Sequence, residues 1–188
     1  MRIWDCHCHL ANETADEVLR AMDGAGIERI NLFSRYPAQG HGPDFAYRRE
    51  EARAAIDQVA RIQAAAPDRV YGLIWATPWM PGMVEEIEYG LGGRGLRGVK
   101  MIPDHWDATE EVAVPIFEKV RDLGKPIQFH SGILYGMGDS SRFCRPVLFE
   151  ALLNVPGLRF SLAHISWPWV DECIAVFGRF RAAHGSQN

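Results

Sequence analysis

The sequence lacks a hydrophobic run long enough to cross a bilayer, and it lacks a cluster of basic residues. No apolar stretch approaches the roughly 20 residues that a membrane-spanning helix needs, and the start does not read as a secretory signal peptide. Arginine and lysine are scattered, and the formal net charge is -4. We therefore expect neither a nucleic-acid partner nor a membrane partner, and we expect a soluble, cytoplasmic protein.

Cysteine is also scarce. The 188 residues include 4 cysteines, of which Cys6 and Cys8 lie two positions apart. This is not the cysteine pattern of a small secreted domain held by disulfides, so reduced thiols are expected. Cys144 and Cys173 fall in helix-like segments without a partner at metal-ligand spacing, and we assign them to packing.

Strand-like and helix-like segments alternate along the whole chain, without a linker or low-complexity segment. Apolar runs typical of buried strands lie at residues 2–7, 29–34, 69–76, 95–102, 126–131 and 158–165. Segments with helical periodicity follow them at residues 13–24, 47–66, 81–90, 109–123, 143–154 and 168–182. Repeated βα units predict an α/β fold with a parallel sheet, and the length is ample for one core. We predict a single domain over residues 1–188.

Histidines occupy the ends of several predicted strands. His7 and His9 end the first strand, His130 the fifth and His164 the sixth, while Lys100 lies in the fourth. Parallel βα folds gather their functional groups at the carboxyl ends of the strands. Because side chains alternate along a strand, His7 and His9 share one face, and two imidazoles on one face can bind one metal ion. The pattern predicts a shared metal site.

A competing interpretation uses the cysteines of the first strand, because thiolates are good zinc ligands. In a regular strand, however, Cys6 and Cys8 face away from the histidines, toward the surrounding helices, and behave as small apolar residues. Asp5 then lies on the same face as the histidines.

Four segments together resemble the amidohydrolase superfamily. They are DCHCH at residues 5–9, GLRGVKMIP at 95–103, PIQFHSG at 126–132 and LAHISWPW at 162–169. The set is most similar to the amidohydrolase 2 branch, which includes aminocarboxymuconate semialdehyde decarboxylase and related decarboxylases and hydrolases. The similarity runs from residue 1 to about residue 180. It implies a TIM-like (β/α) barrel, of which six βα units are visible here where eight are expected.

The resemblance also implies site residues. In that family the first-strand and fifth-strand histidines bind a divalent metal, commonly zinc, which here indicates His7, His9 and His130. The sixth-strand histidine, a ligand in binuclear members and an acid/base group in decarboxylase-like ones, corresponds to His164. Lys100 matches a fourth-strand lysine that is carboxylated in some binuclear branches, a modification that we do not assume here.

This chain departs from the family pattern at its end. The eighth-strand aspartate that completes the metal site has no counterpart, because the sequence stops in RAAHGSQN after the sixth predicted helix. Either the chain is a C-terminally incomplete version of a longer protein, which we favour, or the barrel closes in another way, for example in a homo-oligomer. An open six-stranded sheet would have two unpaired edges.

These residues predict a metal-dependent hydrolase. A divalent metal, with zinc as the expected ion, activates water for attack on an amide, ester or lactone of a small-molecule substrate. His164 takes or delivers a proton. The alternative is a metal-dependent decarboxylase of a small aromatic or enol carboxylic acid, in which Arg35 holds the departing carboxylate. A third hypothesis is a non-catalytic, metal-binding barrel fragment.

Two long loops, residues 35–48 and 131–142, are expected to act as lids that select the substrate. Five aromatic side chains either line an apolar pocket there or cover the core, namely Trp79, Trp106, Tyr135, Trp167 and Trp169. His41 and His105 are kept as loop contributors, and His184 is expected to be exposed.

Overall fold

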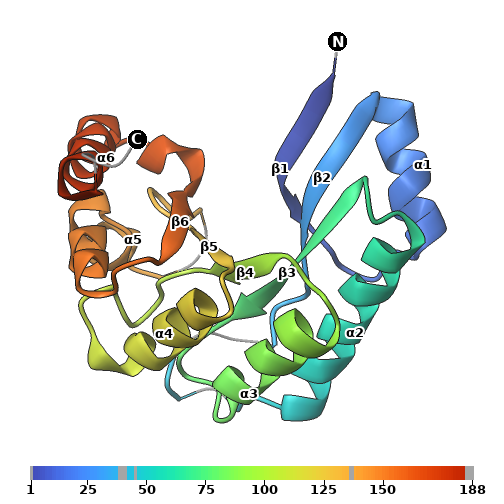
Figure 1. Cartoon of the computed structure of the whole chain (residues 1–188), viewed down its shortest axis with the longest axis horizontal. Helices are drawn as coiled ribbons and strands as arrows, with labels where there is room; N and C mark the ends of the chain where they lie inside the picture. Colours follow the sequence, from blue (N-terminus) through green and yellow to red (C-terminus); the bar gives the residue numbers. More distant parts are fainter. Residues whose placement is uncertain (1, 38–41, 45, 136–137, 185–188) are drawn as a thin grey trace.

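Six parallel strands form one curved sheet in the computed structural model, which describes residues 2–37, 42–44, 46–135 and 138–184 (Figure 1). The strands follow one another in chain order across the sheet. They are β1 (Ile3–His9), β2 (Ile27–Phe33), β3 (Val70–Ala76), β4 (Gly98–Met101), β5 (Pro126–Phe129) and β6 (Arg159–Leu162). The sheet curves into a half-barrel with the helices outside it. The predicted α/β barrel class with six βα units is confirmed.

Except for α5, the helices fall where helical periodicity predicts them. They are α1 (Ala15–Ala25), α2 (Arg49–Ala65), α3 (Met83–Glu88), α4 (Val114–Asp122), α5 (Ser140–Phe143) and α6 (Val170–His184). A π-helical turn at Tyr89–Gly93 extends α3, and 3₁₀ turns occupy Glu111–Ala113, Pro146–Asn154 and Ala163–Ser166. No helix in these described ranges combines the length and apolar composition needed to cross a membrane.

The predicted helix at 143–154 differs most from the structure. It divides into the end of the short helix α5 and the 3₁₀ helix Pro146–Asn154. Pro146 explains the division, because its ring clashes with the carbonyl four residues earlier and it lacks an N–H group. By contrast, α1 begins with a capping box, in which Thr14 Oγ accepts from Glu17 N and the Glu17 carboxylate accepts from Thr14 N.

The hydrophobic core lies between the outer face of the sheet and the helices. Val99 and Met101 of β4 belong to this core and are fully buried. The Phe117 ring of α4 packs on Phe129 of β5 at a centroid distance of 5.7 Å, and Phe129 packs on Phe149 at 5.0 Å. Because side chains alternate along a strand, Lys100, between Val99 and Met101, lies on the opposite, inner face.

A buried carboxylate joins α2 to α3. Glu86 is fully buried and accepts hydrogen bonds from Arg49 at 2.5 Å and from Arg53 at 2.7 and 2.8 Å. We expect Glu86→Ala to lower the free energy of unfolding by about 1–3 kcal/mol, less than for a fully buried pair, because both guanidinium groups remain partly hydrated. Urea denaturation measures the loss.

The matched control for Glu86 is Glu88 on the same helix, which pairs with Lys119 at 3.0 Å but is largely exposed. Glu88→Ala is expected to cost less than about 1 kcal/mol. Equal losses for the two variants would contradict the role assigned to Glu86.

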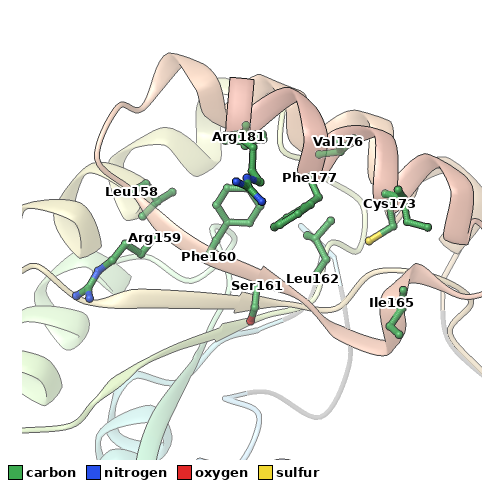
Figure 2. A pocket seen from close by; sticks show the side chains of 12 residues that line it. Leu158, Arg159, Phe160, Ser161, Leu162, Ile165, Cys173, Val176, Phe177 and Arg181 are labelled. Carbon is green, nitrogen blue, oxygen red and sulfur yellow. The ribbon is translucent and has the colours of Figure 1, made fainter. Parts of the chain in front are cut away.

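The sheet has two open edges. Within the described ranges, β1 pairs only with β2, and β6 pairs only with β5. Beside β6, an apolar groove of about 750 Å³ is lined by residues of this strand and of α6. Figure 2 shows Cys173 and Phe177 of α6 pointing toward Phe160 and Leu162 of β6. The groove arises because no further layer among the described residues packs on this face, and none of the four predicted site histidines lines it.

Candidate metal centre

Four histidines meet at the carboxyl ends of β1, β5 and β6. His7 and His9 end β1, His130 follows β5 directly, and His164 lies in the 3₁₀ turn after β6. The ring centroids of His7 and His164 are 4.6 Å apart, those of His130 and His164 4.9 Å, and those of His7 and His9 5.0 Å. The chain thus brings together residues that are more than 150 positions apart in sequence.

The strand that carries the first two histidines contains a β-bulge. Asp5 pairs with Ile30 and Cys8 with Leu32, so β1 advances three residues while β2 advances two. Asp5 accepts a hydrogen bond from the backbone N–H of His7 at 2.9 Å. Burial, and then the hydrogen bond to Asp5, raise the pKa of the Cys8 thiol to about 12.

The bulge corrects the expectation of regular alternation in this strand. The Asp5 carboxylate contacts Cys8 and the backbone of its own strand, whereas regular alternation would place Asp5 with the histidines and Cys8 on the opposite face. Cys8 packs against the core like a small apolar residue, as expected, while Cys6 is exposed. Cys144 is buried, in agreement with its assignment to packing.

His7 and His9 have the spacing of two ligands of one ion. Their Nε2 atoms are 3.1 Å apart. Two nitrogens about 2.1 Å from a divalent ion, at coordination angles of about 90° to 109°, are separated by about 3.0–3.4 Å. The Phe33 ring contacts both imidazoles edge-on, at centroid distances of 4.9 and 5.1 Å, and Trp75 contacts His9 at 5.1 Å. Packing therefore restricts the orientation of the pair.

All four imidazoles are neutral at pH 7. Burial, followed by the charge of Lys100, lowers the pKa of His7 and of His130 to about 3, and the same two causes lower the pKa values of His9 and His164. Neutral imidazole is the form that binds metal ions. In addition, His130 Nε2 is buried without a hydrogen-bond partner. Such an orphaned nitrogen is rare in proteins and suits a metal ligand.

The four histidine side chains do not converge on one point in this structure. Across the ranges that the structure describes, no three His, Cys, Asp or Glu side chains converge closely enough to hold one ion. The His164 ring contacts both His7 and His130. The His7/His9 spacing and the orphaned His130 nitrogen fit a divalent ion.

The turn that carries His164 is strained and fixed to its neighbour. His164, Ile165 and Ser166 have φ values of 62°, 49° and 55°, a left-handed conformation that non-glycine residues seldom adopt in succession. The buried hydroxyl groups of Ser166 and Ser131 are 2.5 Å apart, and Ser131 follows His130 directly. This contact ties the turn after β6 to the end of β5, and so places His164 beside His130.

Arg35, the cation predicted to hold a departing carboxylate, lies at the start of the loop that follows β2. Its side chain is exposed and donates a hydrogen bond to Asn12 Oδ1 at 3.2 Å. It lines a hollow with Glu13, Thr14 and Gln58, and none of the four histidines borders that hollow.

Lys100 is the cation that the fold places beside the histidines. Its side chain is fully buried, its Nζ lies 5.2 Å from the centre of the Phe33 ring, and that Nζ has no hydrogen-bond partner. Burial lowers the pKa of Lys100 to about 7. A charged residue inside the apolar strand GVKM is the sequence signal that could have indicated a buried cation here.

The low pKa of Lys100 predicts a pH-dependent stability. Between pH 7 and the usual lysine pKa near 10.4, the unfolded state binds a proton that the folded state releases, so stability rises with pH. We expect the free energy of unfolding of metal-free protein to increase by up to about 1.4 kcal/mol per pH unit from pH 7 to 8.5. Above that range the raised pKa values of Cys8 and Cys144 act in the opposite direction. Urea denaturation at several pH values tests this, and equal slopes in wild type and Lys100→Met would contradict it.

The aromatic residues predicted either to line a pocket or to cover the core do not all behave alike. Trp106 is fully buried in the core and does not line a pocket, Trp79 Nε1 donates to the Asp104 carbonyl at 3.1 Å, and Tyr135 is 80 % exposed. His105 Nδ1 is 2.9 Å from Asp104 Oδ1. His41 and the His184 side chain lie outside the described residues.

The chain belongs to the amidohydrolase family (Amidohydro_2), whose model matches residues 4–185. A search of curated proteins gave no match. Among solved structures, an uncharacterized TIM-barrel protein from Bordetella bronchiseptica has a TM-score of 0.70 and 18% identity, with 95% of this chain covering 72% of that one. These findings agree with the TIM-barrel fold described above.

Two further solved structures are enzymes with the same fold. 2,6-Dihydroxybenzoate decarboxylase from Rhizobium has a TM-score of 0.66 and 19% identity, with 88% of this chain covering 67% of that one. 5-Carboxyvanillate decarboxylase from Novosphingobium aromaticivorans, solved with manganese and 4-hydroxy-3-methoxy-5-nitrobenzoic acid, has a TM-score of 0.65 and 20% identity, with 91% covering 55%. A 4-oxalomesaconate hydratase from Rhodopseudomonas palustris shares the fold as well.

Proposed function

We propose that this chain carries the histidine part of a divalent-metal site in an enzyme that decarboxylates a small aromatic or enol carboxylic acid. The observation that carries the proposal is the cluster of four neutral imidazoles, in which the Nε2 atoms of His7 and His9 are 3.1 Å apart. The choice of decarboxylation is supported by the two decarboxylases among the solved structures with this fold.

His7, His9 and His130 would hold the ion. When bound, a divalent ion supplies a Lewis acid that orients and polarises the oxygen atoms of the substrate. Zinc remains our expectation from the resemblance, and manganese, which is bound in the 5-carboxyvanillate decarboxylase, is the other candidate. The Phe33 and Trp75 rings orient His7 and His9 for this task.

His164 is placed to move the proton. Its ring contacts His7 and His130, and its side chain reaches solvent. In decarboxylation the bond between the carboxylate and the ring or enol carbon breaks, carbon dioxide leaves, and the carbon takes up a proton. The neutral His164 ring first takes a proton from solvent and then delivers it to that carbon, so that one proton is consumed per turnover.

Hydrolysis of an amide, ester or lactone is the second candidate. It is favoured by the neutral state of His164, since burial and the charge of Lys100 lower its pKa and leave it able to accept a proton from an attacking water. The two candidates differ in the fate of water, because hydrolysis incorporates a water oxygen into the product.

The test is turnover with manganese or zinc in water labelled with ¹⁸O. The panel contains 2,6-dihydroxybenzoate, 5-carboxyvanillate, and an aromatic amide and a lactone. The proposal predicts release of carbon dioxide from a carboxylic acid without ¹⁸O in the organic product. Incorporation of ¹⁸O from the amide or lactone would replace decarboxylation by hydrolysis. Bound metal without turnover on any compound would favour a non-catalytic fragment.

A further inference from the structure

Three polar side chains lie in register on the inner face of the sheet. Lys100 of β4 pairs with Trp75 of β3 on one side and with Gln128 of β5 on the other. Residues in register in a parallel sheet point to the same face. That face is the one with the histidines, because the Trp75 ring contacts His9 and Phe33 contacts both His7 and the Lys100 ammonium group.

Two of these neighbouring side chains are buried hydrogen-bond donors without an acceptor. Neither Lys100 Nζ nor Trp75 Nε1 has a hydrogen-bond partner, and both atoms are shielded from solvent. Ammonium and indole groups can donate but cannot accept, so only an acceptor can satisfy them. Burying a charge without a partner is costly, and such a cost is retained mainly at functional sites.

Nearby carboxylates of the described chain are engaged elsewhere. Asp5 accepts from the His7 backbone and contacts Cys8, and Asp104 pairs with His105. Among the described residues, Lys100 Nζ therefore has no carboxylate partner on this face. An anion that enters this face meets one buried cation and one indole N–H group.

We propose that Lys100 Nζ, with Trp75 Nε1 on the adjacent strand, binds a carboxylate group of the substrate. The inference rests on the proposed function in placing the substrate beside the histidines, and it holds for decarboxylation and for hydrolysis of a carboxylated substrate alike. In this proposal Lys100 is the anion anchor, the cation that binds the substrate carboxylate. The sequence suggested that role for Arg35, which is exposed and donates a hydrogen bond to Asn12.

Binding of benzoate to metal-free protein, measured by titration calorimetry in the presence of a chelator, tests the anchor apart from metal and turnover. We expect Lys100→Met to weaken benzoate binding by about 10- to 100-fold, the effect of one charged hydrogen bond. Trp75→Phe, which keeps the lysine, is expected to weaken binding by about fivefold. Benzamide, the neutral analogue, should bind equally weakly to wild type and Lys100→Met, and inorganic phosphate should not displace benzoate.

Two matched variants are the controls. Arg35→Met removes a cation that is bonded to Asn12, and Lys125→Met removes one that precedes β5, at the end of the strand opposite to His130. Both variants should bind benzoate like the wild type. Because Lys100→Met removes an unpaired buried charge, it should fold and melt at the same temperature as the wild type or higher. Its intact mass should differ from the wild type by the substitution alone.

The anchor is overturned if wild type does not bind benzoate, if Lys100→Met binds it unchanged, or if Arg35→Met loses it. It is also overturned if the wild-type mass shows one carbon dioxide added to Lys100, since Nζ is then not free to donate as an ammonium group. Loss of benzoate binding in Lys100→Met, with no turnover of any compound by wild type, would retain the anchor and reject the proposed reaction. Turnover by Lys100→Met with an unchanged KM would reject the anchor and retain the proposed reaction.

Discussion

His7→Ala and His9→Ala are each expected to lower the affinity for Mn²⁺ or Zn²⁺ by at least about 100-fold, because the loss of an outer-shell partner alone typically costs 10- to 100-fold. The two Nε2 atoms are 3.1 Å apart, so each variant removes one arm of a chelating pair. Competition with a chromophoric chelator at pH 7 measures the affinity. His105→Ala is the control, since His105 pairs with Asp104 and not with the histidine cluster.

Unchanged metal affinity in His7→Ala would show that the pair is joined by a hydrogen bond between its two rings instead of by an ion. That arrangement needs one ring with a proton on Nε2 and the other without. A loss of metal affinity in His7→Ala with no loss in His9→Ala would restrict the ligand role to His7, the less exposed residue of the two.

His164→Asn is expected to reduce kcat by about 10²- to 10⁴-fold, the usual contribution of a general acid/base, while the metal content stays at the wild-type level. Asparagine keeps a polar group and tolerates the left-handed backbone that residue 164 adopts, so the turn should persist. The rate is measured with saturating metal on the substrate found in the panel, and partial rescue by added imidazole would identify the missing proton carrier.

Loss of metal in His164→Asn would contradict this assignment. His164 would then be a ligand, as the sixth-strand histidine is in the binuclear members that the sequence resembles. A normal kcat with normal metal content would instead leave His164 as a packing neighbour of His7 and His130.

Much of the fold was predictable, because hydrophobic periodicity is a local property. The six strands and their order follow from alternating apolar and amphipathic segments. The helix α1 is flanked by Thr14 and Gly26, which are recognisable cap residues. The position of the four histidines at strand ends could also be predicted, because the carboxyl end of each strand can be located from the sequence alone.

Features that depend on contacts between distant segments were not predictable. The bulge in β1 comes from its pairing with β2, and it moves Asp5 away from its expected position. The burial of Lys100 depends on Phe33 and on the strands either side of β4. The sequence left open whether Trp106 lines a pocket or covers the core, and its contacts with distant segments place it in the core beside Phe117.

The apolar groove beside β6 is not the candidate site, and the reason is physical. The groove follows the open edge of β6 and the uncovered apolar face of α6, where Phe177 is 63% exposed and Ile174 60% exposed. The histidines lie on the inner face, where buried polar atoms without partners gather instead. The size of this groove reflects missing packing, whereas buried polar groups without hydrogen-bond partners indicate a functional site.

The most direct test of the central claim is the metal content of wild type and His130→Ala, purified without chelator and measured by elemental mass spectrometry. The buried, unpartnered His130 Nε2 and the His7/His9 pair predict about one divalent ion per chain in wild type and a substantial loss in the variant. Wild-type protein that binds no divalent ion even after incubation with Mn²⁺ or Zn²⁺, or His130→Ala that retains a full complement, would contradict a metal centre joining β1 to β5.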